Sequence, residues 1–420
     1  MKKLWTKEDD RRNAQKLLDE LLLYVNDLDS PYCFLIKKEL SASFCSKEKS
    51  KKIDEGWIDS ALLKLKTENK ETIEDFEKIY SSVKASIHRK NNKPKKHWSL
   101  FIPFNLETEI TKISVLGKIF YIVKKLDLLS EDDVIKSLKE RIPPSKVLPR
   151  DKDKYIEQLP KYFLKTEVYA LEHQSLWKEV EKYYDLIRGI VDFSMHHGVG
   201  PDPLREYKKD FRKRTFLELP DLAIARDENN ELEVLPLTPD CKQDIKPAKL
   251  NATAESNFVF VTKLVSFLND DENSIEALIA DCLRLYGQAM DAIHDHQAFL
   301  SLWQLAERIT YSKSFHGNSE EVARRLNLFN KSKLPGSNSK YVLKEFADQR
   351  NKIVHKGIHE VYEDEIIVLR LICEMALDWI MHNKDQIKTE EHLQAYYNLI
   401  ELTNYEKEIY SFVEAERKKM

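Results

Sequence analysis

The sequence predicts an α+β protein, with a mixed but mostly helical N-terminal region that contains short strands, followed by an all-α bundle. Runs rich in β-branched and aromatic residues occur before residue 250, whereas apolar residues recur at helical spacing almost continuously after it. At 420 residues the chain is also longer than one ordinary compact domain. We therefore expect two regions, residues 1–250 and residues 251–420, the second ending in a helical extension.

The N-terminal region alternates between helical and strand patterns. The helical patterns cover residues 1–28, 73–87, a segment from Ser130, and 165–196. Strand patterns cover 31–36, 101–104 and 113–123, and the segments 221–226 and 231–235 have the pattern of a β-hairpin. Three prolines and no clear period make 236–251 the best candidate for a linker.

Beyond the linker, nearly every segment has the apolar period of an amphipathic helix. The expected helices are 274–293, 297–310, 319–330, 340–356, 364–382 and 390–419. The run 258–268 is compatible with a strand or a helix, and we favour a helix. Loops rich in Ser, Gly and Asn separate several of them. This pattern is typical of a helical bundle.

Composition argues against several classes of function. No segment approaches the roughly 18 uncharged apolar residues of a membrane span, and the first residues lack the apolar run of a secretory signal. The five cysteines lie far apart, which favours reduced thiols over disulfides or a zinc site. No glycine motif of a P-loop or a dinucleotide-binding fold occurs. We expect a soluble, cytoplasmic protein with no membrane association, metal or cofactor.

The helix at 340–356 contains the most informative residues. Its apolar residues form one stripe, and Arg350 falls near the centre of that stripe. A buried guanidinium needs a carboxylate, a phosphate or a cleft, because an unpaired buried charge is costly. Asn351 and His355 share the neighbouring side of the helix, whereas Arg350 and His355 lie about 140° apart. Two copies of the helix in a symmetric homodimer would bring both groups to one site.

Arg, Asn and His without a metal suit the attack of a ribose 2′-OH on its neighbouring phosphate. Histidine exchanges protons near neutral pH, and an arginine stabilises the charge of the phosphorane. Residues 311–357 contain ten Lys or Arg and four Asp or Glu, whereas the whole chain has a net charge of −3. A polyanion such as RNA is therefore a reasonable ligand of this segment.

The segment Arg350-Asn-Lys-Ile-Val-His355, followed by Lys-Gly, resembles the R-x-x-x-x-H signature of HEPN domains, in the R-N-x-x-V-H form of the Apea-like branch. The upstream segment 299–307, which ends in Glu307, also looks like the second helix of that branch. The resemblance covers about residues 256–383. It implies a four- or five-helix bundle that dimerises through the motif helix. It also implies a metal-independent endoribonuclease, a hydrolase of antiphage defence or a toxin of a toxin–antitoxin system.

By position, the resemblance implies that Arg350 and His355 are catalytic, that Asn351 supports them, and that Glu307 pairs with Arg350. Further candidate RNA contacts are the basic residues Lys352, Lys356, Arg324 and Arg325. The region 1–250 would then sense a trigger such as a phage component, select the substrate, or bind an antitoxin. The alternative is an inactive HEPN module that dimerises and binds RNA or a nucleotide. Two basic runs, 84–98 with Trp98 and 208–214, are candidate auxiliary contacts to nucleic acid.

Overall fold

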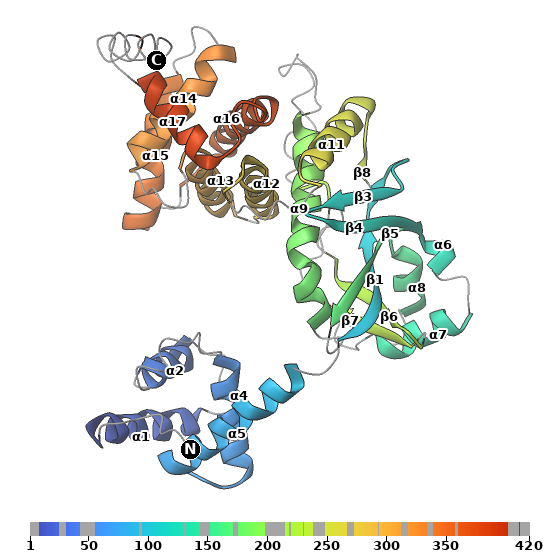
Figure 1. Ribbon diagram of the computed structural model, residues 1–420, viewed down its shortest axis with the longest axis vertical. Coiled ribbons are helices and arrows are strands. Elements are labelled where there is room, and N and C mark those ends of the chain that lie inside the picture. Colours follow the sequence, from blue (N-terminus) through green and yellow to red (C-terminus); the bar gives the residue numbers. More distant parts are fainter. Residues whose placement is uncertain are drawn as a thin grey trace, which may run out of the picture. The chain divides into compact units, whose positions relative to one another are not determined.

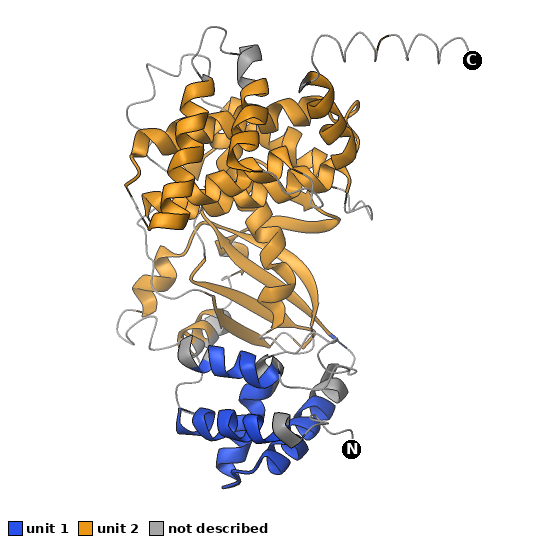
Figure 2. Cartoon of the chain, turned by 90° about the vertical axis from the view of Figure 1, so that its left-hand side faces the viewer, with its two compact units in different colours: residues 1–95 blue, residues 96–420 orange. Residues whose placement is uncertain are grey.

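The computed structural model describes residues 8–24, 31–42, 55–91, 95–128, 132–142, 152–170, 175–197, 215–217, 220–229, 231–237, 248–266, 273–292, 294–311, 318–333, 339–357, 360–401 and 411. The chain divides into two compact units, residues 1–95 and residues 96–420 (Figure 2). The expected α+β class is confirmed, because helices predominate and one unit contains an antiparallel sheet.

The first unit is helical. Its described residues form α1 (Glu8–Leu23), α2 (Pro31–Ala42), α4 (Glu55–Thr67) and α5 (Ile73–Asn91). Their apolar faces enclose a core of their own, which includes Leu18, Leu62 and Phe76. The side chain of Gln15 joins α1 to the start of α5, because its oxygen accepts a hydrogen bond from the Ile73 backbone N–H at 2.6 Å.

The prediction of a strand at 31–36 is wrong, because this segment belongs to α2. Proline is well tolerated in the first turn of a helix, where its missing N–H has no partner to lose. Cys33, Ile36 and Leu40 are buried, and their spacing of three and four residues places them on one helical face. A window of six residues was too short to reveal this period.

The second unit begins with the sheet. Its strands are β1 (Lys96–Phe104), β3 (Lys112–Val115), β4 (Lys118–Lys124), β5 (Tyr162–Ala170), β6 (Leu222–Asp227) and β7 (Leu232–Pro236). They pair in the order β3-β4-β5-β1-β6-β7, and every neighbouring pair is antiparallel. Two short strands, β2 (Leu106–Glu107) and β8 (Ala248–Lys249), pair in parallel beside it. The expected hairpin at 221–235 and the strands near 101–104 and 113–123 are confirmed.

Helices lie on both faces of the sheet (Figure 1). The long helix α9 (Leu176–His197) shares a core with one face, whose inward residues include Leu100, Ile102 and Val168. On the other face lie α7 (Asp132–Arg141) and α8 (Lys152–Gln158), which bury Phe101 and Ile224 together with their own apolar residues. A short helix, α6 (Lys125–Leu128), follows β4.

Part of the helix expected at 165–196 is a strand. Residues up to Ala170 form β5, and α9 begins only at Leu176. Thr166 and Val168 are buried while Tyr169 is exposed, so this segment has the two-residue period of a strand, and β-branched residues favour that conformation. Over so short a segment the apolar residues fit either a helical or a strand period. Hydrogen bonding to β1 and β4 makes the segment a strand.

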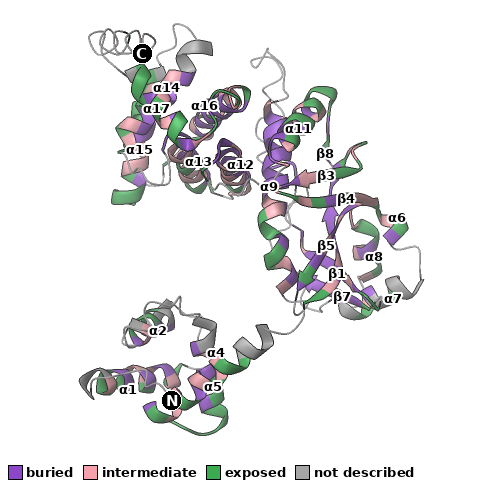
Figure 3. Ribbon diagram, viewed as in Figure 1, coloured by how far each residue is buried: buried purple, intermediate pink, exposed green. Residues whose placement is uncertain are grey.

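The rest of the second unit is helical. It contains α11 (Ala252–Leu264), α12 (Ile275–Asp291), α13 (Asp295–Thr310), α14 (Ser319–Lys333), α15 (Ser339–Lys356), α16 (Glu363–His382) and α17 (Glu390–Glu401). The expected helices between residues 274 and 382 are confirmed to within a few residues, whereas the helix expected at 258–268 begins six residues earlier, at Ala252. The part of 390–419 beyond Glu401 lies almost entirely outside the described residues. More than half of the residues of α9 and α12, and half of those of α13, are buried (Figure 3).

The boundary expected near residue 250 does not coincide with the division into compact units, which falls after Lys95. The reason is that α9 packs on the sheet and also on α12, so the sheet and the helices after residue 250 share one continuous hydrophobic cluster. Among the described residues, no helix combines the length and apolar character that crossing a membrane requires.

Candidate functional site

The site is built on α15, whose buried side chains are Leu343, Phe346, Ala347 and Ile353. These residues recur at helical spacing and hold the helix against α13 and α14. Gly357 ends the helix with a φ of 65°, a left-handed conformation that glycine adopts without steric cost, and its N–H donates to the carbonyl of Ile353 at 3.2 Å. Val354, expected in the apolar stripe, is instead 51% exposed.

Arg350 lies at the edge of the packed face of α15, where its side chain is 27% exposed. One terminal nitrogen donates to Oε1 of Glu307 on α13 at 3.3 Å, and the other donates to Oδ1 of Asn351 at 3.3 Å. Glu307 is held in turn by Trp303, whose indole N–H donates to the same Oε1 at 3.0 Å. The carboxylate of Glu307 therefore fixes one edge of the guanidinium and balances its charge.

Asn351 connects α15 with the first turn of α14. Its Oδ1 accepts a second hydrogen bond, from the hydroxyl of Ser319 at 3.2 Å. Asn351 and Ser319 are both partly buried. Four side chains from α13, α14 and α15 thus form a continuous polar chain, Glu307, Arg350, Asn351 and Ser319, which we call the arginine cluster.

His355 lies in the last turn of α15 and its side chain is exposed. Lys352 and Lys356, which the sequence suggested as RNA contacts, are exposed on the same helix. On one helix, five residues of separation place Arg350 and His355 about 140° apart. A single α15 therefore presents the guanidinium and the imidazole to different directions.

The two arginines of α14 have opposite surroundings. Arg324 is exposed and lies 3.5 Å from Glu321, which leaves its position compatible with an RNA contact. Arg325 is 2% exposed, so an RNA contact by Arg325, expected from the sequence, does not fit its position. Adjacent residues on a helix point about 100° apart, so one faces solvent while the next faces the interior.

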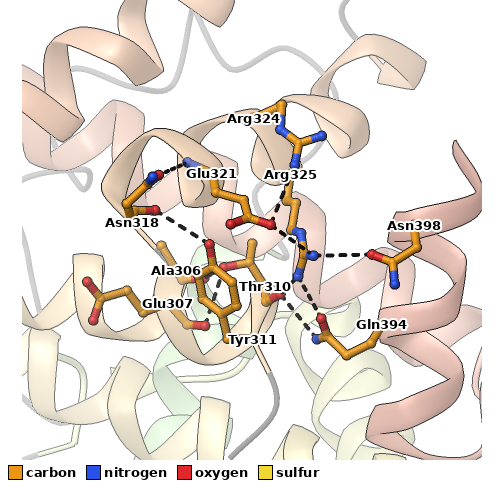
Figure 4. A network of polar contacts seen from close by, with 10 residues as sticks. All are labelled: Ala306, Glu307, Thr310, Tyr311, Asn318, Glu321, Arg324, Arg325, Gln394 and Asn398. Carbon is orange, nitrogen blue, oxygen red and sulfur yellow. Dashed lines mark hydrogen bonds and ion pairs between the residues drawn. The ribbon is translucent and has the colours of Figure 1, made fainter. Parts of the chain in front are cut away.

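Arg325 is the centre of a buried polar network beside the arginine cluster (Figure 4). One nitrogen of its guanidinium donates to the Thr310 carbonyl at 2.7 Å and to Gln394 Oε1 at 2.6 Å. The other donates to Asn398 Oδ1 at 3.4 Å and lies 3.1 Å from a carboxylate oxygen of Glu321. The rings of Tyr311 and Tyr397 lie 5.1 and 5.0 Å from the guanidinium carbon.

This network supports the arginine cluster through the backbone. Figure 4 shows the carboxylate of Glu307 pointing away from Arg325, while the Glu307 carbonyl accepts from the Tyr311 N–H at 2.9 Å and from the Thr310 hydroxyl at 3.3 Å. The network thus fixes the end of α13, which carries Glu307, to the start of α14. Burial raises the pKa of the Tyr311 phenol well above its usual range, and the nearby Glu321 carboxylate acts in the same direction.

Of the two basic runs, the first has a different geometry from that expected. Trp98 is only 6% exposed and belongs to the core between the sheet and α9, so its ring is not available for stacking on a base. Within that run, Lys84 lies on α5 and Lys95 precedes β1. The second run, 208–214, lies outside the described residues.

Two members of the site were missed by the sequence reasoning. Trp303 lies four residues before Glu307 on α13, and this spacing alone places both side chains on one face, so a signal was present. Ser319 was identified only as the first residue of a helix. No local pattern connects it with Asn351, because 32 positions separate them and only the packing of α14 on α15 brings them together.

The geometry thus joins Arg350, Asn351 and Glu307, which the sequence selected, and leaves His355 exposed at the helix end. No family model, curated protein or solved structure matches the chain.

Proposed function

We propose that the protein is a metal-independent endoribonuclease of the HEPN type, and that Arg350 and His355 are its catalytic residues. The observation that supports this most is the partly exposed guanidinium of Arg350, which Glu307 and Asn351 hold on a helix with an exposed histidine in its last turn. A fixed but accessible guanidinium stabilises a developing phosphorane, because its orientation is set before the substrate arrives.

The reaction is a transesterification within RNA. The 2′ oxygen attacks the adjacent phosphorus, the bond between phosphorus and the 5′ oxygen breaks, and a 2′,3′-cyclic phosphate forms. The proton lost by the 2′-OH is balanced by the one gained by the leaving 5′ oxygen. His355 accepts or donates one of these protons, since an imidazole exchanges protons near neutral pH.

One α15 presents Arg350 and His355 about 140° apart, so the proposed active unit is a homodimer. Two α15 helices that meet across a two-fold axis place Arg350 of one copy near His355 of the partner subunit. RNA is the proposed partner, and Lys352, Lys356 and Arg324 are proposed to contact its backbone, since all three are exposed. A role in antiphage defence or as a toxin, under the control of a trigger or antitoxin, is part of the proposal because the resemblance to HEPN domains implies it.

The test is cleavage of a labelled single-stranded RNA in excess EDTA. We expect Arg350→Ala and His355→Ala to lose at least about 100-fold in rate, as is usual for proton transfer and charge stabilisation. The matched controls are Arg284→Ala, a half-exposed arginine beside Asp281, and His382→Ala, an exposed histidine in the last turn of α16. Equal cleavage by all four variants would refute the assignment.

One observation favours a second candidate, a module that binds RNA without cleaving it. Glu307 balances the charge of Arg350 at 3.3 Å, an arrangement that also occurs in purely structural ion pairs. This candidate predicts saturable binding of RNA that remains intact over hours. The nuclease predicts fragments with a 5′-hydroxyl end.

A further inference from the structure

The orientation of the Asn351 amide is determined by its neighbours. A guanidinium has only donors, so the Asn351 atom that lies 3.3 Å from Arg350 is its oxygen. The Ser319 hydroxyl donates to the same oxygen at 3.2 Å. The amide nitrogen of Asn351 therefore points away from both groups, with its two N–H donors directed out of the Ser319–Arg350 pair.

Ser319 is itself held in place by the first turn of α14. The side chain of Asn318 accepts from the Glu321 N–H at 2.9 Å, and the Tyr311 hydroxyl lies 3.5 Å from the Asn318 carbonyl. Figure 4 shows both contacts next to the Arg325 network, which also holds Glu321. The residues that flank Ser319 are thus held in this turn, and one of them, Glu321, pairs with the buried Arg325.

We propose that Ser319 is a positioning residue of the proposed active site. Together with Arg350 it fixes the Asn351 amide so that the Asn351 N–H donors bind a phosphate oxygen of the RNA beside the reacting bond. This inference rests on the proposed function. A neutral amide is suited to the task, because it donates to an anionic oxygen without taking protons from the reaction.

The first test separates positioning from stability. Ser319→Ala removes one of the two hydrogen bonds to Asn351 Oδ1, so we expect kcat to fall about 3- to 10-fold with a smaller change in KM. Ser319→Thr retains the hydroxyl and is expected to recover most of the loss. Ser266→Ala, which removes a serine hydrogen bond to the Lys263 carbonyl elsewhere in the unit, is the matched control. A wild-type kcat in Ser319→Ala overturns the inference.

The second test concerns the direction of the amide. Asn351→Asp keeps an oxygen towards Ser319 and Arg350 but replaces the N–H donors with a carboxylate oxygen. We expect binding of an RNA carrying 2′-O-methyl groups, which cannot be cleaved, to weaken at least about tenfold, while thermal stability is unchanged or higher. If Asn351 only braces Arg350, any loss comes from repulsion between the new carboxylate and the phosphates, which salt screens. A loss relative to the wild type that disappears at high salt therefore refutes the inference.

The two assays distinguish the inference from the function on which it rests. Binding of the 2′-O-methyl RNA without cleavage of ordinary RNA refutes the nuclease but leaves the Asn351→Asp comparison decisive for the amide. Cleavage that is equal in wild type, Ser319→Ala and Asn351→Asp refutes the inference alone. Absence of both binding and cleavage in the wild type refutes both.

Discussion

Gly189 on α9 marks a point where this helix meets the backbone of α12. A Cβ atom built at Gly189 would lie 1.9 Å from the carbonyl oxygen of Leu283, whereas ordinary contacts begin at 3.4 Å. In Gly189→Ala the two helices must therefore separate locally by about 1.5 Å, because the opposing atom belongs to the backbone and cannot rotate away. This separation would disturb the core that the sheet and the bundle share.

Two terms of opposite sign set the magnitude. Alanine is better than glycine in a helix by about 1 kcal/mol, which favours the variant. Overpacking a tight core costs about 1–3 kcal/mol, and more where the backbone has to move. We expect steric repulsion to win, with a net loss of about 2 kcal/mol or more in the free energy of unfolding. The entropy of unfolding is about 2.1 cal/mol/K per residue near 60 °C, so in a unit that spans residues 96–420 a loss of about 2 kcal/mol lowers Tm by about 3 °C.

Thermal unfolding followed by circular dichroism, together with urea titration, measures this effect. Gly287→Ala is the matched control, because its Cβ would lie 3.1 Å from Gly189 and needs a shift of only a few tenths of an ångström. Its steric cost and its gain in propensity nearly cancel. Gly357→Ala meets no atom within 4 Å but has a φ of +65°, so it loses about 1 kcal/mol through the backbone alone. Equal stability of Gly189→Ala and Gly287→Ala would contradict the reasoning.

Further predictions concern the buried charges and the arginine cluster. Arg325→Ala leaves buried acceptors without their donor and is expected to lower the free energy of unfolding by about 3 kcal/mol or more. Arg324→Ala, at an exposed position, is expected to change it by less than about 0.5 kcal/mol. Similar urea midpoints for the two variants would argue against the network. Burial raises the pKa of Asp192 to about 7, so the folded state favours the protonated carboxyl. The stability that this preference contributes is fully present below about pH 4 and is lost as the pH rises through about 7. Asp192→Asn should accordingly gain stability over the wild type between pH 4 and pH 8 in thermal melts, and a constant difference across this range would count against it. Glu307→Gln removes the negative charge beside Arg350 while keeping an acceptor for Trp303. The uncompensated charge of Arg350 should then attract the phosphates more strongly, and affinity for uncleavable RNA should rise about 2- to 5-fold in a filter-binding assay. Unchanged affinity would mean that Arg350 does not contact the phosphates.

The sequence alone determined the features that depend on neighbours within a few positions. The helical periods after residue 250, the hairpin near 221–235 and the divergent directions of Arg350 and His355 all follow from backbone geometry over one or two turns. The pairing of a guanidinium on α15 with an acid upstream followed from a resemblance of motifs.

Tertiary structure alone decided the features that depend on distant pairing. Residues 162–170 form a strand because β1 and β4 offer it hydrogen-bonding partners, although the local pattern was also compatible with a helix. Arg325 is buried and Arg324 is exposed because α13 and α17 cover one side of α14. The two residues are adjacent and of the same type, so the sequence itself does not show which of them is buried. The contact of Ser319 with Asn351 likewise exists only because packing brings two helices together, since short-range periodicity contains no information about which helices meet.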